Sequence, residues 1–249
     1  MRDMIKLDQQ LGRIEELEWD SLFFGRRIGK IILNTNQDLE ELDETLNRAQ
    51  LQDYQLIYVF SSPSIVLPAL LLRKFDSQLV DTKVVYTQRL SDVSSSESFD
   101  TIYPFNSADD LSELYNLAFE SGQYSRYRVD PFFTEQDFQG LYREWIDKSV
   151  QGIIADEVFL YKLEGKILGM VTLKIVGNRG VIGLMAVGAA YRGQAIGKKL
   201  LNYIKKFLAS KEIRQLDVAT QLENRAACLF YEKNGFSIAS GTDIYHVWL

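Results

Sequence analysis

Apolar residues recur along this chain with two different periods, and these periods predict where strands and helices lie. In the N-terminal part, strands are predicted at residues 28–33, 54–60 and 83–90, and helices at residues 39–51 and 64–75. Asn36 or Asp38 is suited to cap the first of these helices, and Pro68 interrupts the second. Residues 19–25 fit a loop, whereas residues 4–13 fit a strand and a helical turn equally well. The pattern therefore predicts an N-terminal α/β unit.

The C-terminal part begins after a serine-rich polar stretch at residues 91–98, which is typical of a linker. We therefore expect two domains, residues 1–96 and residues 97–249. In the second domain, helices are predicted at 107–120 and 134–149, followed by an antiparallel meander of strands at 157–163, 167–176 and 181–187. It continues with a helix at 196–208, a strand at 215–219, a helix at 224–233 and strands at 236–239 and 245–249. The predicted fold class is α/β (α+β), with a mixed, mostly antiparallel sheet in the second domain.

The segment from Val181 to Ser210 combines an apolar strand, a turn rich in small residues and an amphipathic helix. From Arg192 to Lys211 there are six basic residues and no acidic one, although the whole chain has a net charge of −6. An ordinary crossover connection has the same pattern of elements but does not require this local charge. Because the free N–H groups at a helix N-terminus attract anions, the turn predicts a binding site for a pyrophosphate group.

Composition narrows the function further. The chain has 249 residues, 46% of them hydrophobic and 25% charged, as is usual for a globular domain. The N-terminus lacks the apolar core of a signal peptide, so we expect a cytoplasmic protein. One cysteine and one histidine exclude an internal disulfide and an ordinary zinc site, and no metal is expected. The net negative charge argues against nucleic acid or an anionic membrane as the main partner.

The run from Ala186 to Leu201 resembles the acyl-CoA binding signature of the GNAT superfamily of N-acetyltransferases. Arg192 and Gly197 match the first and last positions of the signature core, whereas Ala195 stands where the family usually has glycine. Alanine tolerates a positive φ poorly, so we expect acetyl-CoA to bind with somewhat reduced affinity. The resemblance implies that the acetyl-CoA site consists of Met185, Ala186, Val187, Arg192, Gly193, Gln194, Ala195, Ile196, Gly197, Lys198 and Asn224.

Asn224 and Tyr231 are seven residues apart, so they share one face of the predicted helix at about 10 Å separation along its axis. In the GNAT pattern that this pair resembles, the amide contacts the pantetheine arm and the phenol acts as general acid on the thiolate. The implied reaction is direct attack of an amine on the thioester through a tetrahedral intermediate. Its oxyanion can be stabilised by backbone N–H groups at residues 184–187, provided that this strand diverges from residues 215–219. A helix cap at Asn224 and a core role for Tyr231 are the alternatives.

The sequence identifies no general base. His246 is the single histidine and is isolated in the last strand, where a structural role is more typical. Cys228 has no evident His or acid partner, so we expect it to be a buried structural residue. A water relay can replace a dedicated base.

Several stretches resemble the GNAT acetyltransferases that act on dTDP-4-amino-4,6-dideoxygalactose (dTDP-fucosamine), namely residues 19–25, 125–131, 142–145 and 245–248. This resemblance implies a nucleotide-linked amino sugar as acceptor. Arg126 can contact its diphosphate, Tyr124 can stack on a ring, and Asp130 can orient hydroxyls or the amine. A salt bridge between Arg126 and Asp130 within the loop is an equally simple interpretation.

Two other functions remain open. One is a GNAT enzyme for a peptide, polyamine or antibiotic amine, although a polyamine site would require carboxylates rather than arginines and aromatics. The other is a non-catalytic acyl-CoA-binding protein. The C-terminal strands also offer an edge through which a homodimer can form.

Overall fold

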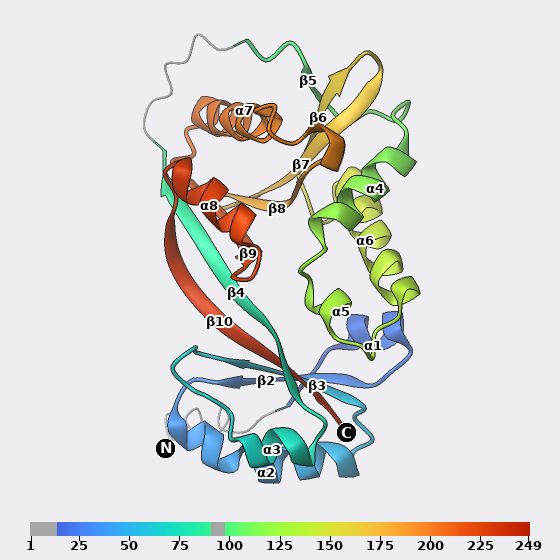
Figure 1. The fold of residues 1–249 in the computed structure, drawn as a ribbon, viewed down its shortest axis with the longest axis vertical. Coiled ribbons are helices and arrows are strands. Elements are labelled where there is room, and N and C mark those ends of the chain that lie inside the picture. Colours follow the sequence, from blue (N-terminus) through green and yellow to red (C-terminus); the bar gives the residue numbers. More distant parts are fainter. Residues whose placement is uncertain (1–13, 91–97) are drawn as a thin grey trace, which may run out of the picture. The chain divides into compact units, whose positions relative to one another are not determined.

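The computed structural model describes residues 14–90 and 98–249 (Figure 1). The prediction for residues 4–13 and nearly all of the predicted linker lie outside these residues. The chain divides into two compact units, one formed by residues 1–83 with 241–249 and the other by residues 84–240. These units differ in their bounds from the predicted domains 1–96 and 97–249, and that division stays a prediction. In the part of the chain that the structure describes, no helix is long and apolar enough to cross a membrane.

The first unit is a small α/β layer. Its strands lie in the order β1-β2-β3-β10, with β2 and β3 parallel and the other neighbours antiparallel. These strands are β1 (Glu15–Glu16), β2 (Ile28–Leu33), β3 (Leu56–Ser61) and β10 (Ser237–Trp248), and the helices are α1 (Glu18–Phe24), α2 (Asn36–Leu51) and α3 (Ala69–Lys74). Leu42 and Leu46 of α2 are buried in a core with Ile57 and Val59 of β3. The amphipathic pattern of the sequence therefore placed this core correctly.

Four predictions for this unit are wrong in detail. The helix predicted at residues 64–75 begins only at Ala69, because Pro68 occupies its N-cap. The predicted loop at residues 19–25 is helix α1, which ends at Gly25 in a left-handed conformation (φ 63°). The cap of α2 is Thr35 instead of Asn36 or Asp38, because Thr35 and Asp38 form a reciprocal capping box. The strands predicted at 236–239 and 245–249 are one continuous strand, β10.

The second unit contains the remaining elements, except that residues 78–83 of β4 belong to the first unit and residues 237–240 of β10 belong to the second. Its strands lie in the order β4-β9-β8-β7-β6-β5. They are β4 (Gln78–Arg89), β5 (Ile102–Pro104), β6 (Glu157–Leu163), β7 (Lys166–Val176), β8 (Arg179–Val187) and β9 (Gln215–Gln221). The helices are α4 (Leu111–Ser121), α5 (Arg126–Val129), α6 (Glu135–Val150), α7 (Ile196–Ser210) and α8 (Arg225–Lys233), with a 3-10 turn at Ala189–Tyr191. The predicted meander is confirmed, because β6, β7 and β8 are antiparallel neighbours.

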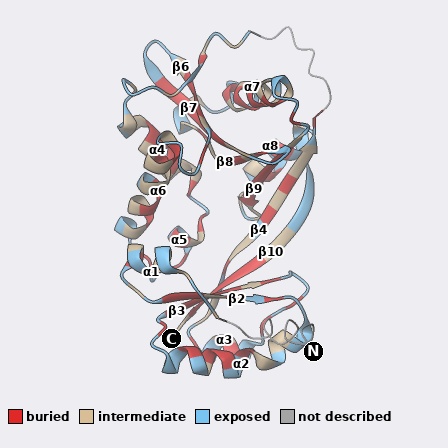
Figure 2. Cartoon of the chain, turned by 180° about the vertical axis from the view of Figure 1, so that it is seen from behind, coloured by how far each residue is buried: buried red, intermediate tan, exposed pale blue. Residues whose placement is uncertain are grey.

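The core of the second unit forms between the sheet and helix α7. One face of α7 is buried, including Leu200, Leu201, Ile204 and Leu208, and the burial colouring of Figure 2 shows the exposed residues of the same helix on its other side. Gly180 permits the contact between helix and sheet, since a Cβ there would lie 2.5 Å from Leu208 Cδ1. This packing fixes the start of α7 next to the end of β8.

Candidate active site

Strand β8 separates from β9 halfway along its length. The two strands pair in parallel from Gly180 to Ile182, and no residue of β8 beyond Ile182 pairs with β9 in the described structure. Residues Met185 to Val187 pair with β7 on their other side. The divergence expected for an oxyanion site is therefore confirmed, and the backbone of Met185, Ala186 and Val187 borders the gap.

A β-bulge shifts the register between β7 and β8 just before this point. Thr172 Oγ1 accepts a hydrogen bond from Leu184 N at 2.8 Å, which satisfies an N–H group that the irregular ladder would otherwise leave open. Gly183 makes the contact possible, because a Cβ there would lie 2.8 Å from the same oxygen. The bulge thus sets how the last residues of β8 face the gap.

The turn before α7 has the backbone of an anion site. Gly193 (φ 79°) and Ala195 (φ 60°) both adopt left-handed conformations, and Ala195 occupies the N-cap position without a side-chain cap. Successive N–H groups in such a turn point to one side, together with those of the first turn of α7. Gln194 and Lys198 are exposed, whereas the side chain of Ile196 lies in the core. Ile196 can therefore contact a ligand only through its backbone.

Arg192 makes contacts that its sequence position did not predict. Its Nη2 donates to Glu120 Oε2 of α4 at 2.8 Å, and its Nε donates to the carbonyl oxygen of Val187 at 3.1 Å. The guanidinium thus connects the turn, the end of β8 and the end of α4. Glu120 lies near the C-terminus of its helix, where a negative charge is unfavourable, and its pairing with Arg192 compensates for this position.

These elements surround a pocket of about 660 Å³. It is lined by Glu120, Ser121, Gln123, Tyr124, Met185, Ala186, Val187, Arg192, Gly197, Asn224, Ala226, Ala227, Phe230 and Tyr231. Among the described residues that line it, Glu120 alone carries a carboxylate. One cavity therefore brings together Tyr231, which is the predicted general acid, and Tyr124, which is the predicted stacking residue. The end of β8 and the turn before α7 also line it.

Tyr231 is almost completely buried, at 6% exposure, yet it lines this pocket. Its hydroxyl lies 4.0 Å from Met185 Sδ, and its ring packs between Tyr86 and Phe236. Burial, with a smaller contribution from Cys228, raises the pKa of the Tyr231 phenol above its ordinary value. The phenol is therefore protonated at neutral pH, as a proton donor must be.

Asn224 caps helix α8, because its Oδ1 accepts a hydrogen bond from Ala227 N at 3.1 Å. It also lines the pocket. Asn224 can therefore cap the helix and line the pocket at the same time. The capping hydrogen bond fixes the position of its side-chain amide. Cys228 is buried in the hydrophobic core, as expected for a structural cysteine.

The other predicted substrate residues do not line this pocket. Arg126 Nη2 donates to Tyr127 Oη at 2.7 Å, and Asp130 is fully buried, with Oδ1 accepting from Phe132 N. His246 is fully buried in the first unit and stacks on Tyr58. Contacts of Arg126 and Asp130 with a substrate therefore stay predictions.

Sequence reasoning missed Glu120, although an acidic residue near the predicted end of a helix was a usable signal. The carboxylate is held in place because α4 is anchored at its other end. Asp110 caps the helix, Lys162 pairs with Asp109, and Glu113 Oε2 accepts from Ile167 N at 2.9 Å.

Comparison with known proteins gives one family match. Residues 109–236, just over half of the chain, match the model of the acetyltransferase (GNAT) family. The spore coat polysaccharide biosynthesis protein SpsD of Bacillus subtilis is 27% identical over 139 residues, 56% of this chain and 48% of that protein. The chain thus spans about half the length of that relative.

Two further similarities extend over most of the chain. The dTDP-fucosamine acetyltransferase of Escherichia coli O6:H1 is 24% identical over 229 residues, which cover 91% of this chain and 94% of that enzyme. A crystal structure of a functionally unknown conserved protein from Staphylococcus epidermidis superposes with a TM-score of 0.60 at 14% identity, over 90% of this chain and 84% of that one. The latter similarity concerns the fold alone.

Proposed function

Because the chain belongs to the acetyltransferase (GNAT) family, and is thus an N-acetyltransferase, we propose that its acceptor is the primary amine of a nucleotide-linked amino sugar. The observation that carries this proposal is the extent of the similarity to dTDP-fucosamine acetyltransferase, which covers 91% of this chain and 94% of that enzyme. Both compact units are therefore included in the comparison, and the similarity is not confined to the family domain.

Enzymes of this family use acetyl-CoA, which supplies an activated acetyl group as a thioester. The residues present fit such a co-substrate. The turn at Gly193 and Ala195 and the first turn of α7 offer backbone N–H groups to a pyrophosphate, and Asn224 borders the pocket that leads to Tyr231. The turn is where we place the pyrophosphate, and the pocket is where we place the thioester.

The roles of the chain's residues follow from this placement. Backbone N–H groups at the end of β8 stabilise the negative charge that develops on the thioester oxygen when the amine attacks. The new bond forms directly between the amine nitrogen and the acetyl carbon, and Tyr231 donates its phenolic proton to the sulfur when the carbon–sulfur bond of the tetrahedral intermediate then breaks. Met185 contacts the Tyr231 hydroxyl and holds the ring against the end of β8.

Glu120 is our candidate for the group that receives a proton from the attacking amine. It is a carboxylate in the pocket, and it is half-buried beside the guanidinium of Arg192. A pyrophosphate near the turn would compete for Arg192 and leave the carboxylate accessible to the amine. A polyamine acceptor would favour several carboxylates, and the lining of this pocket does not favour it.

The test is a panel assay. The purified full chain is incubated with acetyl-CoA and either nucleotide-linked amino sugars, spermidine or a peptide with a free N-terminus, and thiol release is measured. We expect turnover with the nucleotide sugars and at most weak turnover with the other amines. Preferred acetylation of spermidine or the peptide would refute the proposed acceptor class. Binding of acetyl-CoA without turnover on any amine would instead favour a non-catalytic protein.

A further inference from the structure

The hydroxyl group of Tyr231 faces a sulfur atom of the protein itself. Among the described residues, its only hydrogen-bond partner is Met185 Sδ, at 4.0 Å. A thioether is a weak acceptor, so a buried hydroxyl gains little from this contact. Met185 thus places a sulfur atom next to the group that, in the proposed reaction, protonates the sulfur of a thioester.

The side chain of Met185 occupies space that the acyl donor needs. A general acid must come within hydrogen-bond reach of the atom that it protonates. Because Tyr231 is almost completely buried, its hydroxyl meets a ligand only through the pocket that both residues line. The Met185 thioether already lies there, so it and the thioester sulfur require the same space.

The backbone around Met185 is held on the side of β7. Met185 is the register partner of Val171, which is fully buried. The preceding residue, Leu184, donates its N–H to Thr172 Oγ1 at 2.8 Å. A shift of this backbone away from the pocket would break these contacts with β7.

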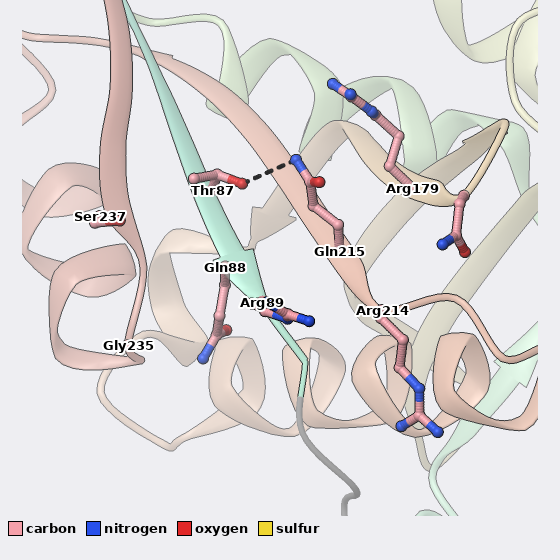
Figure 3. Close-up of a pocket in the computed structure, with 9 residues that line it drawn as sticks. Thr87, Gln88, Arg89, Arg179, Arg214, Gln215, Gly235 and Ser237 are labelled. Atoms are coloured by element: carbon pink, nitrogen blue, oxygen red, sulfur yellow. Dashed lines mark hydrogen bonds between the residues drawn. The ribbon is translucent and has the colours of Figure 1, made fainter.

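The other end of β8 is anchored to β9. Arg179 begins the strand, and its Nη1 donates to the buried Asp217 of β9 at 3.3 Å. Figure 3 shows a further link, from β9 to β4, in which Gln215 Nε2 donates to Thr87 Oγ1 at 3.2 Å. Since β8 is held at both ends, space for the donor comes from the side chain of Met185 and not from movement of the strand.

The other large side chains beside Met185 are fixed by packing. The Tyr231 ring lies 5.9 Å from the ring of Tyr86 and 5.5 Å from that of Phe236, between centroids, and these contacts do not involve Met185. Phe230 packs edge-on against Tyr231 at 5.3 Å. Little or no side-chain volume is added to the pocket by Ala186, Gly197, Ala226 and Ala227. Met185 is half-buried and has three rotatable side-chain bonds, so it is the part of this wall that adjusts.

We propose that Met185 determines which acyl groups the enzyme transfers, a role that rests on the placement of the thioester in this pocket. The side chain turns away from the Tyr231 hydroxyl when the thioester binds, and its volume then limits the acyl chain beside the end of β8. The single methyl group of an acetyl donor fits beside methionine. A longer unbranched chain requires the space that Met185 fills.

Calorimetric titration of the full chain with acetyl-CoA and with butyryl-CoA tests this role without any acceptor. We expect the wild type to bind acetyl-CoA at least about tenfold more tightly than butyryl-CoA. In Met185→Ala this preference should fall at least about tenfold, because the truncation leaves room in which two further methylene groups become buried. Met185→Leu nearly keeps the side-chain volume and should keep the preference within about twofold of the wild type.

The measured quantity is a ratio of two affinities on one variant, so a partly unfolded sample affects both ligands equally. Leu229→Ala is the matched control. It removes a similar volume from an exposed position of α8 that does not line the pocket, and it should leave the ratio unchanged.

Four results would overturn the inference: equal affinity of the wild type for the two thioesters, an unchanged ratio in Met185→Ala, an equal fall of the ratio in Met185→Leu, or failure of both thioesters to bind. The acceptor is tested separately. Thiol release with spermidine in preference to the nucleotide sugars would refute the proposed acceptor class, while the two affinities would still report on Met185.

Discussion

Ala195 adopts a backbone conformation that an L-residue rarely takes, at the start of α7 (φ 60°). The left-handed conformation costs a non-glycine residue about 1 kcal/mol, and glycine removes this cost. We therefore expect Ala195→Gly to raise the free energy of unfolding by about 1 kcal/mol and to tighten acetyl-CoA binding. Thermal unfolding and calorimetric titration measure both effects.

Ala209→Gly is the control, because Ala209 lies within α7 in an ordinary helical position. Glycine destabilises a helix there, so this variant should lose stability and keep its affinity for acetyl-CoA. If Ala195→Gly also lost stability, the conformation described for the turn would be wrong.

The proposed role of Glu120 predicts how the activity of a Glu120→Gln variant depends on pH. With Glu120→Gln, the hydrogen bond to Arg192 can persist while the basic group is lost. We expect kcat/KM for the acceptor to fall about 100-fold near pH 7 and to recover as pH rises through the pKa of the acceptor amine, because a neutral amine needs no base. Pre-steady-state and steady-state rates between pH 6 and 10 provide the measurement.

The matched control is Glu144→Gln, which removes a carboxylate from α6 that pairs with Lys148. It should leave the pH profile unchanged. A deficit in Glu120→Gln that is equal at every pH, together with weaker acetyl-CoA binding, would assign Glu120 to positioning of the Arg192 turn alone.

Deprotonation of Tyr231 should not lower activity at the pH values where an ordinary phenol loses its proton. Its pKa is raised by burial, so the proton that it donates stays bound above pH 10, the ordinary value. Tyr231→Phe should lower kcat at least about 100-fold with little change in CoA affinity. A wild-type profile that falls with a midpoint below 10, with the fall absent in Tyr231→Phe, would contradict this assignment.

Among single residues, the sequence was sufficient to place together those whose positions depend on local spacing, while their roles stay predictions. Asn224 and Tyr231 share a helix, and both line the pocket. Glu120 could not be paired with Arg192 from spacing, because 72 residues separate them and only the contact between α4 and the turn brings them together. Arg126 and Asp130 were predicted to contact the substrate, but neither lines the pocket. Residue type alone does not predict which side chains become buried.

At the scale of elements, the bulge between β7 and β8 leads to a prediction about stability and activity. Thr172→Val removes the acceptor for Leu184 N while it nearly keeps side-chain volume. A buried N–H group left without a partner costs about 1–3 kcal/mol, and the loss occurs next to Met185. We expect lower stability and a reduced kcat, measured by denaturant unfolding and by the thiol assay.

Thr172→Ser supplies the control, because its hydroxyl can still accept the hydrogen bond. It should recover most of the activity. Equal losses in the two variants would indicate that the methyl group, and not the oxygen, supports the bulge.

Helices and strands were predicted well where their periods are long and regular, as in α2, α6 and β6 to β8. The hydrophobic pattern gave wrong elements where contacts between distant segments determine the secondary structure. Residues 237–248 contain Gly241 and Asp243, which suggest a turn, yet the pairing of residues 243–248 with β3 keeps β10 continuous. Helix α1 was assigned to a loop, although acidic residues in its first turn and Gly25 at its end are regular helix signals.

At the scale of the whole molecule, the two compact units imply two cooperative regions. Val247 is fully buried in the first unit, where it pairs with Ile57. Val247→Ala should lower the protection of β2 and β3 amides from hydrogen exchange by about 1–2 kcal/mol and affect the amides of β6 and β7 less. Exchange measured by mass spectrometry on the intact chain resolves the two regions.

Val176→Ala tests the same substitution at an exposed position of β7 and should change neither region detectably. If Val247→Ala reduced protection equally in both units, the chain would unfold as one cooperative body. The predicted division at residues 96 and 97 would then have no thermodynamic meaning.

The separation of β8 from β9 also has a consequence for what the protein can recognise. Beyond Ile182, β8 is paired only with β7 in the described structure, so main-chain groups on the edge that faces the gap are not used by β9, although the Val187 carbonyl accepts from Arg192 and Leu184 N donates to Thr172. A ligand that carries amide groups of its own, as the pantetheine arm does, can engage this edge as a further peptide strand would. Recognition of that kind depends on backbone groups, which every substitution except one by proline leaves in place. Substitutions that change the specificity of the acceptor pocket can therefore leave the binding of the acyl donor unchanged.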